Sequence, residues 1–559
     1  MRVFVVISAV LLLGLNGPQL VKYDFINKGA RIIDGSGNPW YGGDIGIKDG
    51  KIAAIGRLDT DLAKDFKDVH ELIVAPGFID VHTHVERSIR EIPTAENYLF
   101  DGVTSIVTGN CGGSETDLDA FFAELRYGGI SINVSTLIGH NSVRRAVMGS
   151  AQREPTPEEQ AQMEALVDKA MLSGAVGFST GLIYIPGTYS KTPEVVGLAK
   201  AASRRNGIYA SHIRNEGNDE QMDIFGAIGE AINIGREARM PVEISHFKVS
   251  SKKLWGQSVK TIALIEQARA EGLDVTVDQY PYTASSTNLG VLAPSWALAD
   301  SDTAMKARFN DHATRKRIVA DMKKSLARAG RDNYSYAFVA RCRWDSTLEG
   351  KTISQINKEL QRKATLDDEI TTVLEMLEKG GASMIYHTMG EEDVQRIMQY
   401  PYSMVASDGG IIKFGDGMPH PRSYGTNARV LGHFVREKKV LRLEEAIRKM
   451  TSLPAQRFGF SDRGLIRPGM WADLVVFDET TVTDKSTFEK PHAYSTGIHY
   501  VFVNGNIVIS HENHTGARPG QIILGSATVR QTDTTEQEAR YGSLFSYFAA
   551  YATGLRESP

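Results

Sequence analysis

The sequence has few cysteines, little net charge and almost no long apolar runs. Cys111 and Cys342 are the only cysteines among 559 residues, which excludes a disulfide framework, although one bridge between them is possible in an exported protein. Lys and Arg number 63 against 67 Asp and Glu, so the net charge is −4 and we expect no nucleic-acid partner. Hydrophobic residues make up 42% and charged residues 23%, which is typical of a globular protein and excludes disordered and collagen-like chains.

One short apolar segment, Val3–Leu15, follows Arg2 at the start of the chain. It is too short to span a bilayer comfortably and is typical of the central part of a signal peptide. We therefore predict a signal peptide over residues 1–18 and a periplasmic or secreted protein; an uncleaved membrane anchor and a buried strand are the alternatives. No other segment is long and apolar enough to cross a membrane, so no stable span is expected after processing.

Both ends of the chain carry short apolar strands separated by tight turns. Asp-Gly and Lys-Gly turn signals lie beside the strands near the N-terminus, and the pattern returns in ADLVVFD, HYVFVNGNIVIS and QIILG. Neither set is long enough to form a stable sheet alone. The sequence therefore predicts a composite β-sandwich built from residues 19–75 and 465–524, with residues 525–559 as a C-terminal tail.

The centre of the chain, residues 76–464, alternates apolar strands with amphipathic helices. For example, Thr156-Pro157-Glu158-Glu159 is a capping box with proline at the first helical position, and Gly174 is placed to end that helix. Polar residues follow the strands, as they do in an α/β fold of the (β/α)₈, or TIM barrel, type. The eight expected strands end near these residues: His84, Cys111, His140, Thr180, His212, His246, Tyr280 and Asp408. We expect residues 290–344 to form an inserted subdomain over the barrel mouth, and a strand near Met384–His387 has no assignment.

Four of these strand-end residues, together with His82, are candidate metal ligands. His82 and His84 are two residues apart on a strand and so point the same way, although two structural histidines are the alternative. Cys111 precedes two glycines that leave its sulfur reachable, but a lone cysteine is also often a small buried apolar residue. His212 and His246 occupy equivalent places on successive strands and can reach a common ion. Cysteine and histidine ligands favour Zn²⁺ over Mg²⁺ or Ca²⁺.

Asp408 lies at another strand end, before Gly409-Gly410. A carboxylate beside a metal can accept a proton from water and pass it to a leaving group, whereas the alternative role is a turn residue that caps the next helix. A zinc ion that keeps an open position polarises a carbonyl and activates water. The combination predicts hydrolysis of an amide, an ester or a cyclic amide, without distinguishing among them.

Several motifs together resemble the amidohydrolase superfamily, and within it the D-aminoacylase (N-acyl-D-amino-acid deacylase) family. The resemblance extends from about Tyr23 to Ile523. It rests on PGFIDVHTH, GNCG, the two strands that end in SH, SDG, the block from His420 to Gly432, MTSLPAQRFG and RPGMWADLVVFD. It implies a TIM barrel with a composite β-sandwich. Most superfamily members bridge two metals with a lysine on the fourth strand, but the corresponding segment here, 176–180, has none.

The resemblance also implies roles for individual residues. Cys111, His212 and His246 would form a tight zinc site, and His82 and His84 would form a weaker second position with Cys111. Asp408 would be the acid/base. The substrate carboxylate would bind Lys248, Tyr280 and Ser286, and Tyr184 would help to hold the scissile carbonyl.

Each substrate contact has a structural alternative. Lys248 can be a solvated loop residue, and Tyr280 and Tyr184 can pack at the barrel mouth. His420 and Arg422 can contact substrate, but turn structure explains them equally well.

The function implied is zinc-dependent hydrolysis of an N-acyl-D-amino acid, with a small-molecule substrate as the expected partner. Two alternatives belong to other classes. One is hydrolysis of a different amide, such as a D- or isoaspartyl dipeptide or a cyclic amide of the hydantoinase or dihydroorotase type. The other is a scaffold protein that retains the barrel without catalysis. D-selectivity follows from the resemblance and not from the residues themselves.

Overall fold

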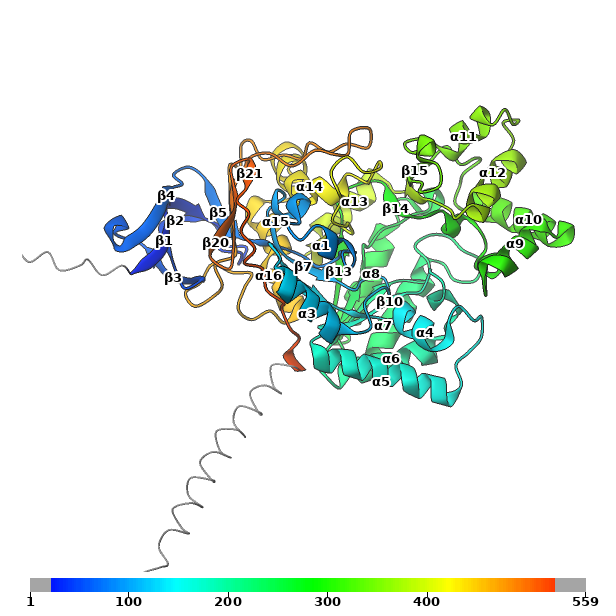
Figure 1. Cartoon of the computed structure of the whole chain (residues 1–559), viewed down its shortest axis with the longest axis horizontal. Helices are drawn as coiled ribbons and strands as arrows, with labels where there is room; N and C mark the ends of the chain where they lie inside the picture. The colour runs from blue at the N-terminus through cyan, green and yellow to red at the C-terminus, as the bar shows by residue number, and fades with distance from the viewer. Residues whose placement is uncertain (1–21, 528–559) are drawn as a thin grey trace, which may run out of the picture.

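The computed structural model describes residues 22–527 and forms an elongated molecule with three parts. A β domain lies at one end, a barrel in the middle and a mostly helical subdomain at the other end (Figure 1). The predicted signal peptide, residues 1–18, lies outside the described residues, as do residues 528–559 of the predicted tail. Within residues 22–527 no helix combines the length and apolarity needed to cross a membrane.

Strands from both chain ends form a single nine-stranded sheet. Its order is β21-β20-β19-β18-β5-β1-β2-β3, with β4 beside β1. The strands are β1 (Tyr23–Ile32), β2 (Tyr41–Lys48), β3 (Lys51–Gly56), β4 (Ala63–Asp68), β5 (Ile73–Pro76), β18 (Leu474–Phe477), β19 (Ile498–Val503), β20 (Asn506–Ser510) and β21 (Asn513–His514). The join is the antiparallel pair β18–β5, in which Val475 lies opposite Ala75. The described part of this domain is therefore composite, because the late strands complete a sheet that the early strands begin.

The turn signals of the first strands act as expected. Lys48 pairs with Lys51 across a two-residue turn, in which Asp49 and Gly50 both have positive φ angles (51° and 78°). Asp-Gly adopts this backbone readily, and it matches the twist of the two strands that it joins.

Eight strand positions form the central barrel. The strands are β6 (Phe78–Asp80), β7 (Val103–Thr108), β8 (Asn133–Thr136) with β9 (Ile138–Gly139), β10 (Gly177–Gly181), β11 (Ile208–His212), β12 (Val242–Ile244), β13 (Val275–Gln279) and β17 (Ser403–Val405). All neighbouring pairs among them are parallel. The barrel closes just beyond the last residues of β6 and β17, where the amide of His84 donates to the carbonyl of Gly409 at 2.9 Å. The predicted TIM barrel is confirmed.

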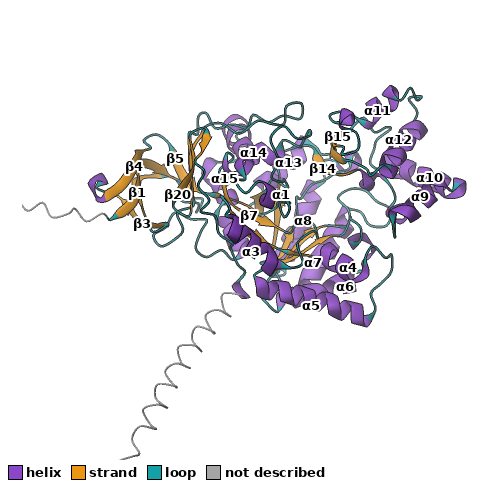
Figure 2. Cartoon of the chain, viewed as in Figure 1, coloured by secondary structure: helices purple, strands orange, loops and turns teal. Residues whose placement is uncertain are grey.

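Helices surround the strands of the barrel (Figure 2). They include α3 (Leu118–Gly128), α4 (His140–Met148), α5 (Pro157–Ser173), α6 (Thr192–Ser203), α7 (Ile224–Ala238), α8 (Ser258–Ala270), α13 (Glu391–Gln399), α14 (Arg422–Arg429), α15 (Leu443–Met450) and α16 (Ser452–Phe458). At the start of α5, Thr156 and Glu159 form the predicted capping box, and Gly174 ends the helix. Local sequence therefore sets the ends of this helix, and its apolar face packs onto the barrel.

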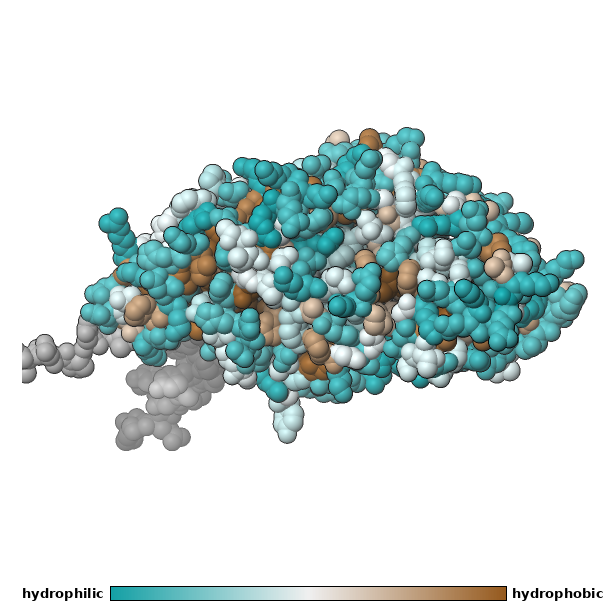
Figure 3. Space-filling view, turned by 90° about the horizontal axis from the view of Figure 1, so that it is seen from above, coloured by the Kyte–Doolittle hydropathy of each residue, from teal (hydrophilic) through white to brown (hydrophobic). Residues whose placement is uncertain are grey.

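The inserted subdomain is larger than the predicted range 290–344. It contains β14 (Ser285–Asn288), α9 (Asp302–Asn310), α10 (His312–Arg328), β15 (Ala337–Arg341), α11 (Ile353–Glu359), α12 (Leu366–Glu378) and β16 (Ser383–Tyr386). The unassigned strand near Met384–His387 is β16, the central strand of an antiparallel sheet in the order β14-β16-β15. The subdomain extends this far because it has its own apolar core, in which Phe309, Ile370 and Met384 are fully buried. The face of the molecule in Figure 3 is mostly hydrophilic, with small separate apolar patches.

Candidate functional site

The candidate metal ligands and the candidate acid/base gather at one rim of the barrel. They end or follow β6, β7, β11, β12 and β17: His82, His84, Cys111, His212, His246 and Asp408. In a parallel barrel the carboxyl ends of all strands open at the same rim, so residues far apart in the sequence meet there.

Three of these residues have a strained backbone. Cys111, His246 and Asp408 adopt positive φ angles of 52°, 37° and 50°. Such conformations cost of order 1–3 kcal/mol each and persist where surrounding contacts fix them, as is typical of functional sites. Here the amide of His246 donates to Oδ1 of Asp278 at 2.8 Å, and the amide of Asp408 donates to the carbonyl of His82 at 2.9 Å.

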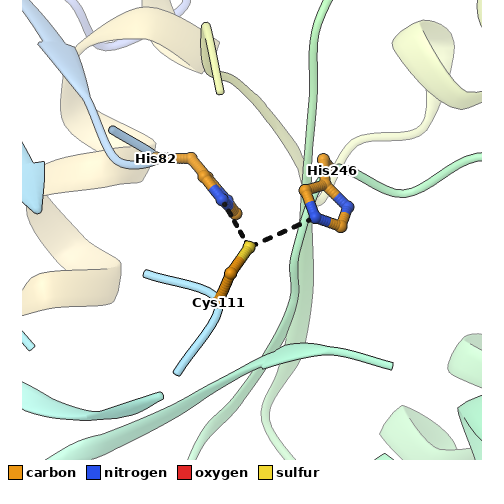
Figure 4. Close-up of side chains that lie close together, drawn as sticks. All are labelled: His82, Cys111 and His246. Carbon is orange, nitrogen blue, oxygen red and sulfur yellow. Dashed lines mark hydrogen bonds between the residues drawn. The ribbon is translucent and has the colours of Figure 1, made fainter. Parts of the chain in front are cut away.

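The sulfur of Cys111 lies among three imidazoles. Its Sγ atom is 3.3 Å from Nε2 of His82, 3.4 Å from Nδ1 of His212 and 3.4 Å from Nε2 of His246. Figure 4 shows the rings of His82 and His246 converging on the sulfur from two sides. Burial alone would raise the pKa of the Cys111 thiol, but the nearby histidines lower it well below its usual value. The site therefore favours the thiolate, which is the form that binds metals.

The donor atoms fit a zinc ion. Nδ1 of His212 lies only 2.7 Å from Nε2 of His246, so a proton or a cation must lie between these two basic nitrogens. Ligand atoms at ~2.0–2.3 Å from a tetrahedral zinc lie roughly 3.3–3.8 Å from one another. Both sulfur–nitrogen distances, at 3.4 Å, fall in this range, whereas the 2.7 Å between the two imidazole nitrogens is shorter and fits a hydrogen bond between the rings. One thiolate and two buried imidazoles are a donor set that zinc prefers.

A second cluster contains His82, His84 and Asp408. Oδ1 of Asp408 is 3.1 Å from Nε2 of His84 and 3.6 Å from Nε2 of His82. The cluster shares His82 with the sulfur site, so the two positions adjoin. Its side chains are less enclosed, because the side chain of His84 is 39% exposed.

The other oxygen of Asp408 binds a buried arginine. NH1 of Arg422 lies 2.8 Å from Oδ2 of Asp408, and the side chain of Arg422 is 5% exposed. Burial by itself would raise the pKa of Asp408, but Arg422 and the neighbouring histidines lower it well below its usual value. Asp408 is therefore an ionised carboxylate held in place from both sides.

The structure decides between the alternatives for His420 and Arg422. His420 has a turn role, because its Nε2 contacts the carbonyl of Ala284 at 2.9 Å and its Nδ1 accepts from the amide of Arg422 at 3.0 Å. Arg422 instead reaches the site through its guanidinium.

Lys248 is buried and paired. Its Nζ atom is 2.5 Å from Oε1 of Glu216 and 2.8 Å from Nδ1 of His246. The same Glu216 oxygen is 3.1 Å from Nδ1 of His246. Lys248 is therefore not a solvated loop lysine, and Glu216, to which the sequence analysis gave no role, ties it to a candidate ligand.

The remaining predicted substrate contacts border the same region. The ring of Tyr184 packs on His212 with centroids 4.6 Å apart, and its hydroxyl accepts from Thr287 at 3.0 Å. The ring of Tyr280 lies under the guanidinium of Arg422, at 4.6 Å from its centroid. In this structure the hydroxyl of Ser286 donates a hydrogen bond to the carbonyl of Met384 at 2.8 Å.

Asp278 is a functional position that the sequence analysis left without a role. Its Oδ2 atom is 3.2 Å from Nδ1 of His82, while its Oδ1 accepts from the amide of His246. It therefore orients one ring and one backbone turn of the site, as carboxylates behind metal-binding histidines commonly do. The signal was available, since Asp278 lies at the end of β13 beside Tyr280.

One further expectation concerns the two cysteines. Cys111 and Cys342 are both free, and Cys342 is buried in the core of the inserted subdomain, so the alternative disulfide between them is absent. Glu86 accepts hydrogen bonds from the hydroxyl of Thr108 and the amide of Gly109, each at 2.6 Å. It supports the loop before Cys111.

Two cavities open at the site on either side of Asp408. The Lys248 cavity has a volume of about 230 Å³ and is lined by residues that include Tyr184, His212, His246, Lys248, Tyr280 and Ser286. The His84 cavity has a volume of about 440 Å³ and is lined by residues that include His84, Ser286, Ile411, Asp416 and Arg422. Asp408 and Ser286 line both.

The chain matches known proteins over most of its length. D-aminoacylase from Alcaligenes xylosoxydans xylosoxydans is 37% identical over 528 residues, which cover 90% of this chain and 98% of that protein. A solved N-acyl-D-glutamate deacylase from Bordetella bronchiseptica, complexed with zinc and a phosphonate inhibitor that mimics the tetrahedral intermediate, is 35% identical with a TM-score of 0.77. The match covers 90% of this chain and 100% of that chain.

A solved D-aminoacylase structure, concerned with a binuclear metal centre that is activated by one metal and attenuated by a second, gives the same identity, TM-score and coverage. The family model described as "Amidohydrolase family" matches residues 66–509, from the β domain through the barrel and back to the β domain. The chain therefore belongs to the amidohydrolase family.

Proposed function

We propose that this protein is a zinc-dependent hydrolase that converts an N-acyl-D-amino acid into a carboxylate and a D-amino acid. The observation that carries the proposal is the approach of the Cys111 sulfur to within 3.4 Å of both His212 and His246, with the carboxylate of Asp408 beside them. The full-length similarity to D-aminoacylase and to N-acyl-D-glutamate deacylase supports the substrate class.

Cys111, His212 and His246 would hold the tightly bound zinc. His82 and His84, with Cys111, would hold a second metal more weakly, because the side chain of His84 is partly exposed. When bound, zinc supplies a Lewis acid that polarises a carbonyl oxygen and lowers the pKa of water.

Asp408 moves the proton in the reaction. Its ionised carboxylate accepts a proton from the attacking water and delivers it to the departing amide nitrogen. The C–N bond of the amide breaks and a C–O bond forms, so one water is consumed per turnover. Arg422 keeps Asp408 ionised and binds its Oδ2, while its Oδ1, which lies 3.1 Å from Nε2 of His84, is the oxygen that would exchange the proton.

The amino-acid half of the substrate binds in the Lys248 cavity. Lys248 offers an ammonium, and Tyr280 and Ser286 offer hydroxyls, to the free carboxylate, as charge-assisted hydrogen bonds. Lys248 forms an ion pair with Glu216 in this structure, so the substrate carboxylate shares or replaces that contact. Tyr184, packed on His212, is placed to hold the scissile carbonyl.

The walls of this cavity favour a neutral, apolar side chain. The inserted subdomain contributes Val291, Leu292, Met322, Leu326, Tyr334, Tyr336 and Tyr386. Among the described residues that line the cavity, Lys248 is the single lysine or arginine, and the carboxylate of the substrate already requires it. A second carboxylate, as in D-glutamate or D-aspartate, would therefore lack a cationic partner.

A substrate panel tests the proposal. The purified protein is assayed with N-acetyl-D- and N-acetyl-L-amino acids, isoaspartyl and D-dipeptides, dihydrouracil and hydantoin, with its zinc content measured in parallel. We expect zinc and hydrolysis of N-acetyl-D-leucine. A preference for a dipeptide or a cyclic amide would show that the substrate belongs to that class and is not an N-acyl-D-amino acid. A protein without zinc or activity would indicate a scaffold.

We also propose export to the periplasm or beyond, on the basis of the apolar segment Val3–Leu15. The test is the N-terminal sequence of the protein recovered from each compartment. A processed protein outside the cytoplasm supports export, and an unprocessed one in the membrane fraction supports an anchor.

A further inference from the structure

The contacts proposed above for the amino-acid half of the substrate do not use the His84 cavity. Lys248 and Tyr280 line the other cavity, and only Asp408 and Ser286 are common to both. The two cavities therefore meet at Asp408, the group that would face the scissile bond.

The wall of the His84 cavity combines apolar and polar residues. Ile92, Ile411, Ile412 and Pro419 contribute to it, and Ile411 is 4% exposed. Arg341 and Asp416 also line the cavity and form an ion pair with each other. The lining also includes the polar groups of His84 and Arg422 beside Asp408 and the charged residues Glu91 and Lys413, so the apolar surface available to a ligand is the one that Ile92, Ile411 and Ile412 form.

We propose that the His84 cavity is the acyl subsite and that it accepts unbranched apolar acyl chains well beyond acetyl. This inference rests on the proposed function. Lys248 binds the carboxylate of the amino-acid half, so the acyl chain, on the far side of the scissile carbon, extends past Asp408 into the other cavity. Burial of each methylene against the apolar part of this wall favours a longer chain.

The size of the cavity supports a chain longer than acetyl. At about 440 Å³ it is roughly fifteen times the ~30 Å³ that one water occupies in the liquid, whereas the methyl of an acetyl group is about as large as one water. A third hollow of about 870 Å³ adjoins it through the shared lining residues Arg341 and Ser383. A chain that fills the first cavity therefore has room to continue.

The first experiment measures kcat/KM for N-acetyl-, N-butanoyl-, N-hexanoyl- and N-octanoyl-D-leucine with the zinc-loaded protein. We expect the octanoyl substrate to be at least as good as the acetyl substrate. A fall of more than about tenfold from acetyl to octanoyl, equivalent to ~1.4 kcal/mol, overturns the acyl subsite. Failure to hydrolyse any of the four overturns the proposed function instead, so the two failures are distinguishable.

Substitutions then identify the cavity. Ile412→Trp narrows the His84 cavity, and we expect it to lower the octanoyl-to-acetyl ratio of kcat/KM by at least about tenfold. Leu292→Trp narrows the Lys248 cavity and should instead lower the ratio of D-leucine to D-alanine among N-acetyl substrates. Leu360→Trp is the control, because Leu360 is 52% exposed and lines neither cavity; it should leave both ratios as in the wild type. If Leu292→Trp, rather than Ile412→Trp, abolishes hydrolysis of the octanoyl substrate, the two halves of the substrate have been assigned to the wrong cavities.

Discussion

NH1 of Arg422 lies 2.8 Å from Oδ2 of Asp408, and both side chains are nearly fully buried. A buried carboxylate without a partner would be driven toward its protonated form, in which it cannot accept a proton from water. The pairing keeps Asp408 ionised and leaves its other oxygen beside His84, at 3.1 Å from Nε2. Arg422 therefore determines how much of the candidate acid/base, Asp408, is ionised at a given pH.

Arg422→Gln should move the acid side of the pH profile to higher pH. Burial raises the pKa of Asp408, while Arg422 and the nearby histidines lower it well below its usual value. Without Arg422, the burial that raises the pKa of Asp408 is opposed by the histidines alone. The pKa of Asp408 therefore rises, and a larger fraction of Asp408 is protonated at a given acidic pH. The measurement is the pH profile of kcat/KM. A lower rate with an unchanged acid limb would mean that Arg422 acts only by contact with the substrate.

Cys111→Ala should lose zinc and activity together, because it removes the sulfur around which three imidazoles are arranged. The matched control is Cys342→Ala, since Cys342 is also a free cysteine but lies in the core of the inserted subdomain. Zinc is measured by elemental analysis and activity with N-acetyl-D-leucine. A Cys111→Ala protein that keeps a full complement of zinc would contradict the ligand set.

Asp408→Asn should retain zinc and lose turnover. Asn has nearly the same shape but cannot accept the proton, and general acid–base catalysis typically contributes ~10²–10⁴-fold to the rate. Asp416→Asn provides a control carboxylate, because Asp416 pairs with Arg341 and belongs to none of the candidate metal-binding groups. Zinc content and kcat are compared for the two variants. Normal turnover by Asp408→Asn would exclude the proposed proton transfer.

Lys248→Met should weaken binding of substrates that carry a free carboxylate. Truncation of one partner of a buried charge pair typically costs about 2–5 kcal/mol, so we expect KM for N-acetyl-D-leucine to rise by at least about 30-fold. The control is N-acetyl-D-leucinamide, which has no carboxylate to bind, so its kcat/KM should change much less. Equal losses for both substrates would indicate that Lys248 acts on His246, which it contacts at 2.8 Å, and not on the substrate.

Much of the site could be predicted from the sequence because residues at the carboxyl ends of parallel strands meet at one rim of a barrel. His82, Cys111, His212, His246 and Asp408 all follow apolar strands, and parallel strands bring such residues to one rim whatever their separation in the chain. Local rules also predicted the capping box at Thr156, because its hydrogen bonds lie within one helical turn.

What the sequence could not show depends on contacts between distant segments. Arg422 follows no strand: it begins α14, directly after His420 and Pro421, and its pairing with Asp408 depends on where that helix lies in the fold. The inserted subdomain was underestimated because β16 pairs with β14 from nearly a hundred residues earlier, as with Ile385 opposite Ser286. Its boundaries follow from that pairing and not from local composition.

Ser325→Arg should shift side-chain preference toward acidic substrates. Ser325 is an exposed residue of α10 that lines the Lys248 cavity, so an arginine there can reach a second carboxylate without entering the core. We expect the ratio of kcat/KM for N-acetyl-D-glutamate over N-acetyl-D-leucine to rise at least about tenfold, since a hydrogen bond to a charged group contributes ~1.5–3 kcal/mol. Ala327→Arg is the matched control: it adds the same charge at an exposed position of the same helix that does not line the cavity. If both variants raise the ratio equally, the added positive charge on α10 acts at long range and not through a contact in the cavity. If neither does, the side chain of the substrate does not extend toward this helix, and the orientation of the amino-acid half must be revised.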